Sequence, residues 1–341
     1  MTVELVMAGR ARRRRRRLGV GCALGASVAV VFVAGLMIGN TNYGLGEVLR
    51  VVIGEDVPGA SFTVGRLRLP RAALGLLAGV AFGVAGVTFQ TMLRNPLASP
   101  DVIGISSGAS AAAVIGIVAF QLDDTEVSLV ALGGALTTAL GMYALASRGG
   151  FAGGRLVLIG IGLAAMLQSV VAYVLARAAA WDLQTAMHWL TGSLNGATWD
   201  RVVPLGVVCA VCTAGLLLRE RDLSVLRLGD DSSAALGVPV HRTRLLVLIA
   251  AVVMLAFATA AAGPISFVAF MAGPIAARLA GPGASLVVPA GLVGALLVLG
   301  ADLAGQNAFG HRYPVGVVTG VLGAPYLIVL LIGINRRGGT L

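Results

Sequence analysis

Residues 68–110 read RLPRAALGLLAGVAFGVAGVTFQTMLRNPLASPDVIGISSGAS, and the order of features in this stretch indicates the fold. Two arginines precede a long apolar run in which Gly75, Gly79 and Gly83 recur every four residues. Small residues at this spacing share one helix face and let a second helix approach closely inside a membrane. The segment NPLASP follows, and its two prolines forbid a continuous helix. The stretch therefore predicts a tightly packed spanning helix and then a turn.

The composition of the whole chain excludes a soluble globular protein. Of its 341 residues, 57% are hydrophobic and 12% are charged, and the mean hydropathy is +0.92. Ordinary soluble domains contain about 25% charged residues. Only helices and closed barrels satisfy their backbone hydrogen bonds in lipid, and a barrel would show short alternating segments. Because the apolar runs are long and continuous, we predict an all-α polytopic membrane protein.

Apolar runs separated by charged breaks predict about ten transmembrane helices. The expected spans are 18–39, 71–93, 103–120, 127–147, 155–177, 202–218, 243–262, 264–279, 284–304 and 314–334. The first run is longer than the apolar core of a secretory signal, so we expect a spanning helix there. Residues 1–17 would then be a basic cytoplasmic segment, 18–334 the transmembrane domain and 335–341 a cytoplasmic tail.

All 25 basic residues are arginines, and their positions argue against nucleic-acid binding despite the net charge of +10. Seven of them lie at positions 10 and 12–17, directly before the first apolar run, where basic residues set topology and contact anionic lipid. With the N-terminus inside, only seven of the 25 lie in outer segments, which predicts that both termini are cytoplasmic. Four of these seven cluster between Arg50 and Arg71 and call for a functional explanation.

Motifs for catalysis and for a bound metal are absent from the sequence. It contains no H-E-x-x-H, and no G-x-x-x-x-G-K-[ST] loop that would bind ATP. Cys209 and Cys212 form a C-x-x-C pair inside an apolar run without further ligands, which favours helix packing over a metal site. We therefore expect no catalytic residue, metal or cofactor, and another chain must supply any ATP site.

Six sequence blocks appear in a fixed order between residues 68 and 331: RLPR, NPLASPDVIGISSGAS, HWLTGSLNGATWDR, LGDDSSAALGV, GPISFVAF and YPVGVVTGVLGAPYLIVLL. Together they resemble the permease subunits of bacterial ATP-binding-cassette importers for iron–siderophores, haem and vitamin B12, the FecCD-like family. HWLTGSLNGATW and GPISF are most similar to the ferric enterobactin-type branch. The resemblance implies a vitamin B12 permease-like bundle in a bacterial plasma membrane that imports ferric siderophores, with haem and vitamin B12 as alternative cargoes.

The same resemblance implies partners on both sides of the membrane: two cytoplasmic ATPase subunits, an extracytoplasmic siderophore-binding protein and a second, identical or homologous permease. In relatives, the arginines of RLPR pair with glutamates of the binding protein. Here these residues are Arg68 and Arg71, with Arg66 adjacent, and interfacial snorkelling is the alternative explanation. At the position of a third docking arginine in some relatives this chain has Gln306, which departs from the pattern.

The block at 228–238 lies within the expected cytoplasmic loop 219–244 and resembles the segment that seats two short helices in a groove of the ATPase. A solvated linker is the alternative. Asp230 suits a helix start, and Ser233 replaces the usual alanine. The residues for which the resemblance implies ATPase coupling are Gly229, Asp230, Ser233, Leu236 and Gly237.

The fifth expected span would line the translocation path in this family. Gly153 and Gly154 stand at gate positions just before it, and Gln168 lies within it. Hydrogen bonding inside the bundle is the alternative role for Gln168 and for Asp302. An ATP-independent secondary transporter is the rival class, but it would need intramembrane carboxylates, and Asp302 is the only acidic residue near a span interior.

Overall fold

The computed structural model describes residues 3–99, 104–146, 153–226, 228–281, 283 and 285–336, and within these ranges the chain forms helices and no strand. The apolar helices are α1 (Val3–Met37), α3 (Leu69–Leu93), α4 (Ile105–Phe120), α5 (Asp124–Ala146), α6 (Gly153–Ala176), α8 (Trp199–Leu218), α11 (Val240–Ala262), α12 (Val268–Ala280), α13 (Val287–Asn307) and α14 (Val315–Arg336). Each apolar run of the sequence corresponds to one of them, which confirms the all-α polytopic fold.

Two of these helices are shorter than a membrane crossing. Among the described residues, eight helices are long and apolar enough to span a membrane, whereas α4 and α12 have only 16 and 13 residues. The residues before α12 are not helical, and Phe267 adopts a left-handed conformation with φ of 65°. The expected span 264–279 therefore begins later than its apolar composition suggests, and the count of ten spans stays a prediction.

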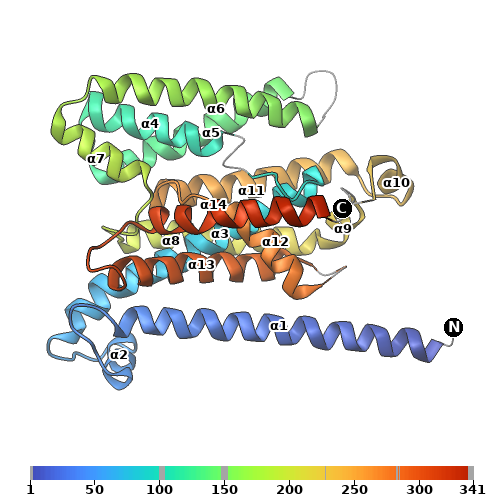
Figure 1. Cartoon of the computed structure of the whole chain (residues 1–341), viewed down its shortest axis with the longest axis horizontal. Helices are drawn as coiled ribbons and strands as arrows, with labels where there is room; N and C mark the ends of the chain where they lie inside the picture. Colours follow the sequence, from blue (N-terminus) through green and yellow to red (C-terminus); the bar gives the residue numbers. More distant parts are fainter. Residues whose placement is uncertain are drawn as a thin grey trace.

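Helix α3 is the central element of the bundle and packs against α8, α11, α12 and α13 (Figure 1). Its glycines lie against the backbone of neighbouring helices, so that a methyl group at Gly79 would overlap Gly294 and one at Gly83 would overlap Ala290. Close backbone contact of this kind replaces the hydrophobic driving force that lipid removes. The packing role predicted for the glycine-bearing face is confirmed.

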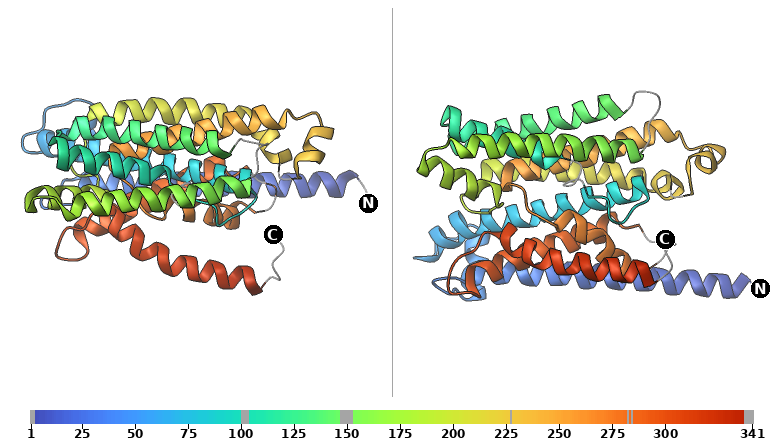
Figure 2. Two further views of the ribbon diagram at one scale, coloured as in Figure 1. Left: turned by 90° about the horizontal axis from the view of Figure 1, so that it is seen from above. Right: turned by 45° about the horizontal axis from the view of Figure 1, so that its top comes forward.

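Helices α4, α5 and α6 form a group on one side of α3 and α11, and α1 runs along the other side against α13 (Figures 1 and 2). Helix α6 packs on α4 and α5 and leaves a long face bare. Leu158 and Met166 on that face are 73% and 68% exposed. A face this apolar must contact lipid or another protein subunit.

The two ends of the bundle carry different short elements. One end, which we call the outer end, has α2 (Leu45–Val52), the π-helix η1 (Ser61–Arg68) and α7 (Ala180–Leu190). The opposite, inner end has α9 (Glu220–Leu226) and α10 (Asp230–Ala235), and α1 begins and α14 ends there (Figure 1). The names follow the arginine asymmetry, and the side of the membrane that each end faces stays a prediction.

Candidate functional site

Arg68 at the outer end holds two elements of its own chain together. Its guanidinium donates hydrogen bonds to the carbonyl oxygens of Leu36 (2.9 Å), Met37 (3.1 Å) and Thr41 (2.7 Å). The last carbonyls of a helix lack intrahelical partners, so Arg68 caps the end of α1. The same group lies 5.3 Å from the ring centroid of Tyr43.

Arg71, in the first turn of α3, is paired within the chain as well. Its Nε and Nη2 donate to the two carboxylate oxygens of Asp302 on α13, at 3.0 and 2.7 Å, and Nη1 donates to Asn195 Oδ1. The side chain of Gln306 also donates to Asp302, at 2.7 Å. Arg71 and Asp302 are 19% and 10% exposed, so this cluster joins α3, α13 and the segment after α7 in a largely buried position.

Arg66 differs from its two neighbours because its side chain is exposed. The structure places Arg68 and Arg71 at one outer-end cavity of about 400 Å³, together with Asp302, Gln306 and Arg312. Arg312 donates a hydrogen bond to Asn40 Oδ1 at 2.8 Å. Three arginines and one carboxylate therefore line this cavity, and Arg66 is the one of Arg66, Arg68 and Arg71 that a partner reaches without first breaking an intrachain contact.

At the inner end, α9 and α10 form the two short helices that the resemblance implies. Gly229 precedes α10 with φ of 104°, a conformation that favours glycine. Ser233 is fully buried, and its hydroxyl donates to the carbonyl of Val225 at 2.9 Å and approaches that of Gly229. The hydroxyl at this position, where the family usually has alanine, therefore ties α10 back onto α9.

Asp230 at the start of α10 contacts two arginines from other helices. Arg244 of α11 donates to both of its carboxylate oxygens at 2.8 and 3.1 Å, and Arg94, directly after α3, lies 3.7 Å away. The hydrogen bonds from Arg244, and then the charges of Arg244 and Arg94, outweigh partial burial and hold the pKa of Asp230 below its ordinary value. The carboxylate is therefore ionised near neutral pH.

The outward surface of this loop is apolar. Leu228 and Leu236, on either side of α10, are 63% and 64% exposed. Gly237 follows with φ of 82° and ends the helix. Exposed leucines on a loop otherwise rich in charge are typical of a surface that a partner covers.

A cavity of about 650 Å³ lies among α4, α6, α12 and α14. Gln168 of α6 lines it, together with hydroxyl-bearing residues and the rings of Phe267 and Phe270. Among the described residues that line it, none carries a charge; the polar ones are Ser99, Ser106, Ser107, Ser110, Gln168 and Ser266. Such a wall offers hydrogen bonds without a fixed countercharge.

The other expected gate residues are placed less completely. Gly153 and Gly154 are the first two residues of α6, and a methyl group added at Gly154 would meet no atom within 4 Å. Residues 147–152, just before them, and residues 100–103 of the NPLASPDVI segment lie outside the described residues. A gate at Gly153 and Gly154 stays a prediction.

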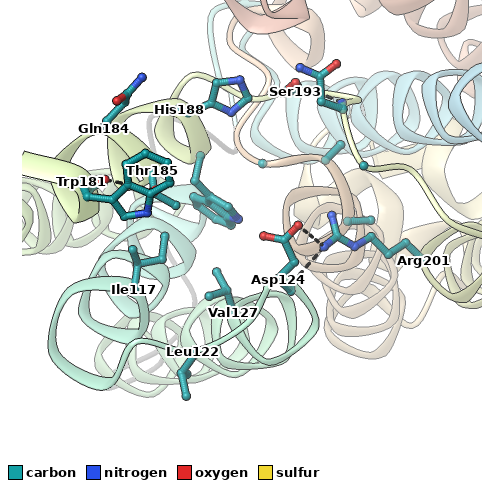
Figure 3. A pocket seen from close by; sticks show the side chains of 16 residues that line it. Ile117, Leu122, Asp124, Val127, Trp181, Gln184, Thr185, His188, Ser193 and Arg201 are labelled. Atoms are coloured by element: carbon teal, nitrogen blue, oxygen red, sulfur yellow. Dashed lines mark hydrogen bonds and ion pairs between the residues drawn. The ribbon is translucent and has the colours of Figure 1, made fainter.

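A second outer-end cavity, of about 370 Å³, lies between α7 and the first turns of α5 and α8 (Figure 3). Trp181 and His188 of α7 contribute to its wall. Arg201 donates to the backbone carbonyl of Asp124 at 3.0 Å and lies 3.5 Å from its carboxylate. Because this arginine is already neutralised by Asp124, the cavity is not an open anion site.

Sequence reasoning missed two of these contacts. Asp302 is the partner of Arg71, but 231 positions separate them, and no local pattern signals the pair. Arg94 lies directly before the NPLASP turn, and no local pattern signals that its side chain lies beside Asp230. Gln90, a buried polar residue inside α3, donates to the carbonyl of Phe270 at 3.0 Å and so forms a hydrogen bond within the bundle. Within the described residues, no group of three or more His, Cys, Asp or Glu side chains could hold a metal ion.

Solved structures support the same architecture. A protein described as a metal-chelate type ABC transporter in an inward-facing conformation superposes with a TM-score of 0.82. The match covers 92% of this chain and 99% of that chain at 23% sequence identity, so it establishes the fold.

Curated relatives establish the family. The ferric enterobactin transport system permease protein FepG of Escherichia coli (strain K12) is 42% identical over 94% of this chain and 98% of its own length. The achromobactin transport system permease protein CbrC of Dickeya dadantii is 40% identical over 89% of this chain and 88% of its own length. The cobalamin import system permease protein BtuC of Halobacterium salinarum is 35% identical over 80% of this chain and 74% of its own length. The profile of the FecCD transport family matches residues 27–333, and the chain is a multi-pass membrane protein that belongs to this family.

Proposed function

We propose that this chain is the membrane-spanning permease subunit of an ATP-binding-cassette importer that carries ferric–siderophore complexes across a bacterial cytoplasmic membrane. The observation that carries the proposal is the 42% identity with the ferric enterobactin permease over 94% of the chain. The cobalamin permease is only 35% identical, over 80% of the chain, so a ferric siderophore is favoured over vitamin B12 as the cargo. The chain performs transport, and separate partner chains hydrolyse ATP.

The cargo passes between this permease and a second one, identical or homologous, along the cavity beside α6. Two observations support this route: the bare apolar face of α6, and the uncharged, hydroxyl-bearing cavity that Gln168 lines. A ferric complex that carries negative charge gains hydrogen bonds from such a wall but is not held there by a full countercharge. Gly153 and Gly154 supply the flexible inner gate in front of α6.

On the inner side, the loop 219–244 seats in a groove of an ATPase subunit. Leu228 and Leu236 provide the apolar contact, while Gly229, Asp230, Ser233 and Gly237 set the shape of α10. The complex has two ATPase subunits, one for each permease. ATP changes the equilibrium between outward- and inward-open forms because nucleotide binds the two forms with different affinity.

On the outer side, Arg66, Arg68 and Arg71 face the siderophore-binding protein. The exposed guanidinium of Arg66 makes direct contact, and Arg68, whose partners are uncharged carbonyls, contributes positive potential, whereas Arg71 keeps its ion pair with Asp302 and positions this end of α3. Charge complementarity of this kind mainly steers and orients docking. The basic segment 1–17 and the tail 335–341 lie on the cytoplasmic side.

The test is uptake of radioactive iron by cells that lack this chain. The cells are offered ferric catecholate and ferric hydroxamate siderophores, with haem and vitamin B12 as control cargoes. The proposal expects uptake of one ferric siderophore to be lost and then restored by the gene. A defect confined to haem or vitamin B12 would keep the importer and change the cargo, and normal uptake of all four would contradict the proposal.

A matched pair of variants tests ATPase coupling in the same assay. Leu236→Asp places a charge in the apolar contact and should abolish uptake. Leu236→Met keeps the contact apolar and should support uptake at the level of the unmodified chain. Pull-down of the ATPase with each variant reports the contact directly. Uptake by Leu236→Asp at the level of the unmodified chain would show that the loop is a solvated linker.

A further inference from the structure

Asp230 is the point at which three helices meet at the inner end. It begins α10, and its carboxylate is shared by Arg244 of α11 and by Arg94 at the end of α3. Helix α3 is the most enclosed helix of the bundle and reaches the outer end at Arg71. Asp230 and its two arginines therefore connect the loop 219–244, which we call the coupling loop, to α3, the helix that packs against most of the others.

The two arginines hold Asp230 with very different strength. Arg244 is 11% exposed and makes two short hydrogen bonds, so it anchors α10 to its own chain. Arg94 is 49% exposed and lies 3.7 Å from the same carboxylate, beyond hydrogen-bonding distance. A half-exposed pair at this distance adds little to stability and can be broken and remade during a motion.

The backbone of Arg94 is in an unfavourable conformation for a residue with a side chain. Its φ of 51° is left-handed, at the position directly after a helix where glycine is usual. The turn is of the glycine type, since the amide of Asn95 bonds the carbonyl of Gln90. Because glycine would adopt this conformation at lower cost, the left-handed backbone points to a role for the side chain of Arg94.

The segment after Arg94 leads to the cavity beside α6, which we call the transport cavity. Asn95 forms a tight turn in which its side chain accepts a hydrogen bond from the amide of Leu97 at 2.9 Å. Leu97 and Ser99 then line the cavity of about 650 Å³. Leu97, the first residue of this segment that lines the cavity, therefore lies only three positions after Arg94.

We propose that Arg94 is the positioning residue through which movement of the coupling loop reaches the transport cavity. When the ATPase displaces α10, Asp230 attracts Arg94, and the rigid turn that follows carries this displacement to Leu97 and Ser99. Arg244 keeps α10 attached to α11 throughout. The inference rests on the proposed importer function and adds the residues through which movement at the inner end displaces the wall of the transport cavity.

The test compares two substitutions of Arg94 in the assembled transporter, reconstituted in proteoliposomes with its ATPase and binding protein. Arg94→Gly removes the side chain and also relieves the left-handed backbone, so the complex should be at least as resistant to heat as the unmodified one. ATP hydrolysis should persist, while uptake per ATP hydrolysed falls by about fivefold or more, the lower end of ordinary coupling energies. Arg94→Lys keeps the charge and should retain most of the uptake.

Arg50→Ala is the matched control. Arg50 is 55% exposed and lies 3.5 Å from Glu55 at the outer end, so its ion pair is as exposed as that of Arg94 but lies far from the loop 219–244. Uptake per ATP should be preserved in this variant. In an Asp230→Asn background, Arg94→Gly should cause no additional loss, because the two residues act through one interaction.

Three results would overturn the inference: uptake by Arg94→Gly equal to that of the unmodified chain, an equal loss in Arg50→Ala, or a loss of uptake that only follows poorer assembly or lower thermal stability. The last result would make Arg94 a structural residue. Failure of the proposed function is distinguishable, because the unmodified complex would then show no siderophore-dependent uptake at all.

Discussion

Helices α3 and α6 have nearly the same mean hydropathy but opposite surroundings. In the most apolar part of each span, 78% of the residues are buried for the span that contains α3, against 11% for α6. Helix α3 presents glycine and alanine to its neighbours, whereas α6 presents large side chains such as Leu158 and Met166 to the outside. In a membrane, apolar character alone therefore does not distinguish the core from the surface, and residue size at the contact does.

The largest expected effect sharpens this contrast with one substitution made in both helices. Gly83→Leu in α3 would drive a side chain into the backbone of Ala290, and we expect a loss of more than about 4 kcal/mol, enough to abolish folded protein. In α6, Gly162 is exposed and a Cβ added there would meet no atom within 4 Å, so Gly162→Leu should change stability by less than about 0.5 kcal/mol. The yield and thermal stability of purified protein in detergent measure both. Equal losses would remove the distinction between the helices.

The second effect concerns the charged outer end of α3. Arg71→Ala leaves the buried carboxylate of Asp302 without its main partner and should destabilise the protein by about 1–3 kcal/mol. Removing both partners, in Arg71→Ala with Asp302→Ala, should restore part of that loss, because no uncompensated charge remains. Thermal unfolding of the two variants decides this. A double variant less stable than the single one would show that Asp302 stabilises the fold independently of Arg71.

The third effect tests what covers the bare face of α6. In a chain whose native cysteines are replaced by alanine, Met166→Cys should cross-link to the second permease with a short bifunctional thiol reagent, at little cost in stability. Leu140→Cys on α5 is the control, since both positions are 68% exposed in the isolated chain. Cross-linking is read on a denaturing gel of the assembled transporter. Equal cross-linking from both positions, or none from Met166, would contradict the placement of α6 at the permease interface.

The smallest effect separates the outer arginines from one another. Arg66→Glu should weaken binding of the siderophore-binding protein a few-fold at low salt and leave the stability of the permease unaltered, because exposed charges mainly steer association. Arg50→Glu, at an arginine in the same outer segment that pairs with Glu55, is the control. Association rates at two salt concentrations measure the difference. A salt-independent loss, or the same loss in both variants, would argue against docking at Arg66.

Much of the fold follows from the sequence for simple physical reasons. Backbone groups in lipid must satisfy one another, so each apolar run had to be a helix, and each is. Glycines four residues apart predicted the packing face of α3, since helical periodicity places them on one side. The two short helices at the inner end and the family itself were readable from ordered sequence blocks.

Helix ends were less predictable, because they depend on local backbone geometry. The basic block at positions 10 and 12–17 continues the helix of the first apolar run, which begins at Val3 and not at the edge of the hydrophobic residues. In α12 the apolar composition starts at residue 264, but the left-handed Phe267 delays the helix to Val268. Composition describes the environment of a segment and not the dihedral angles at its boundaries.

The sequence by itself determined the class of protein, its apolar spans, the asymmetry of its arginines and the family to which it belongs, because these depend on composition and on short-range spacing. Only the tertiary structure decided which helix is central, which arginine is exposed and which charges meet. Arg71 pairs with Asp302, and Arg94 lies beside Asp230, although the residues of each pair are far apart in the sequence and no local pattern predicts their contact. Ion pairs and helix contacts form where the fold brings side chains together, and in lipid every candidate helix offers an equally apolar surface until its neighbours are known.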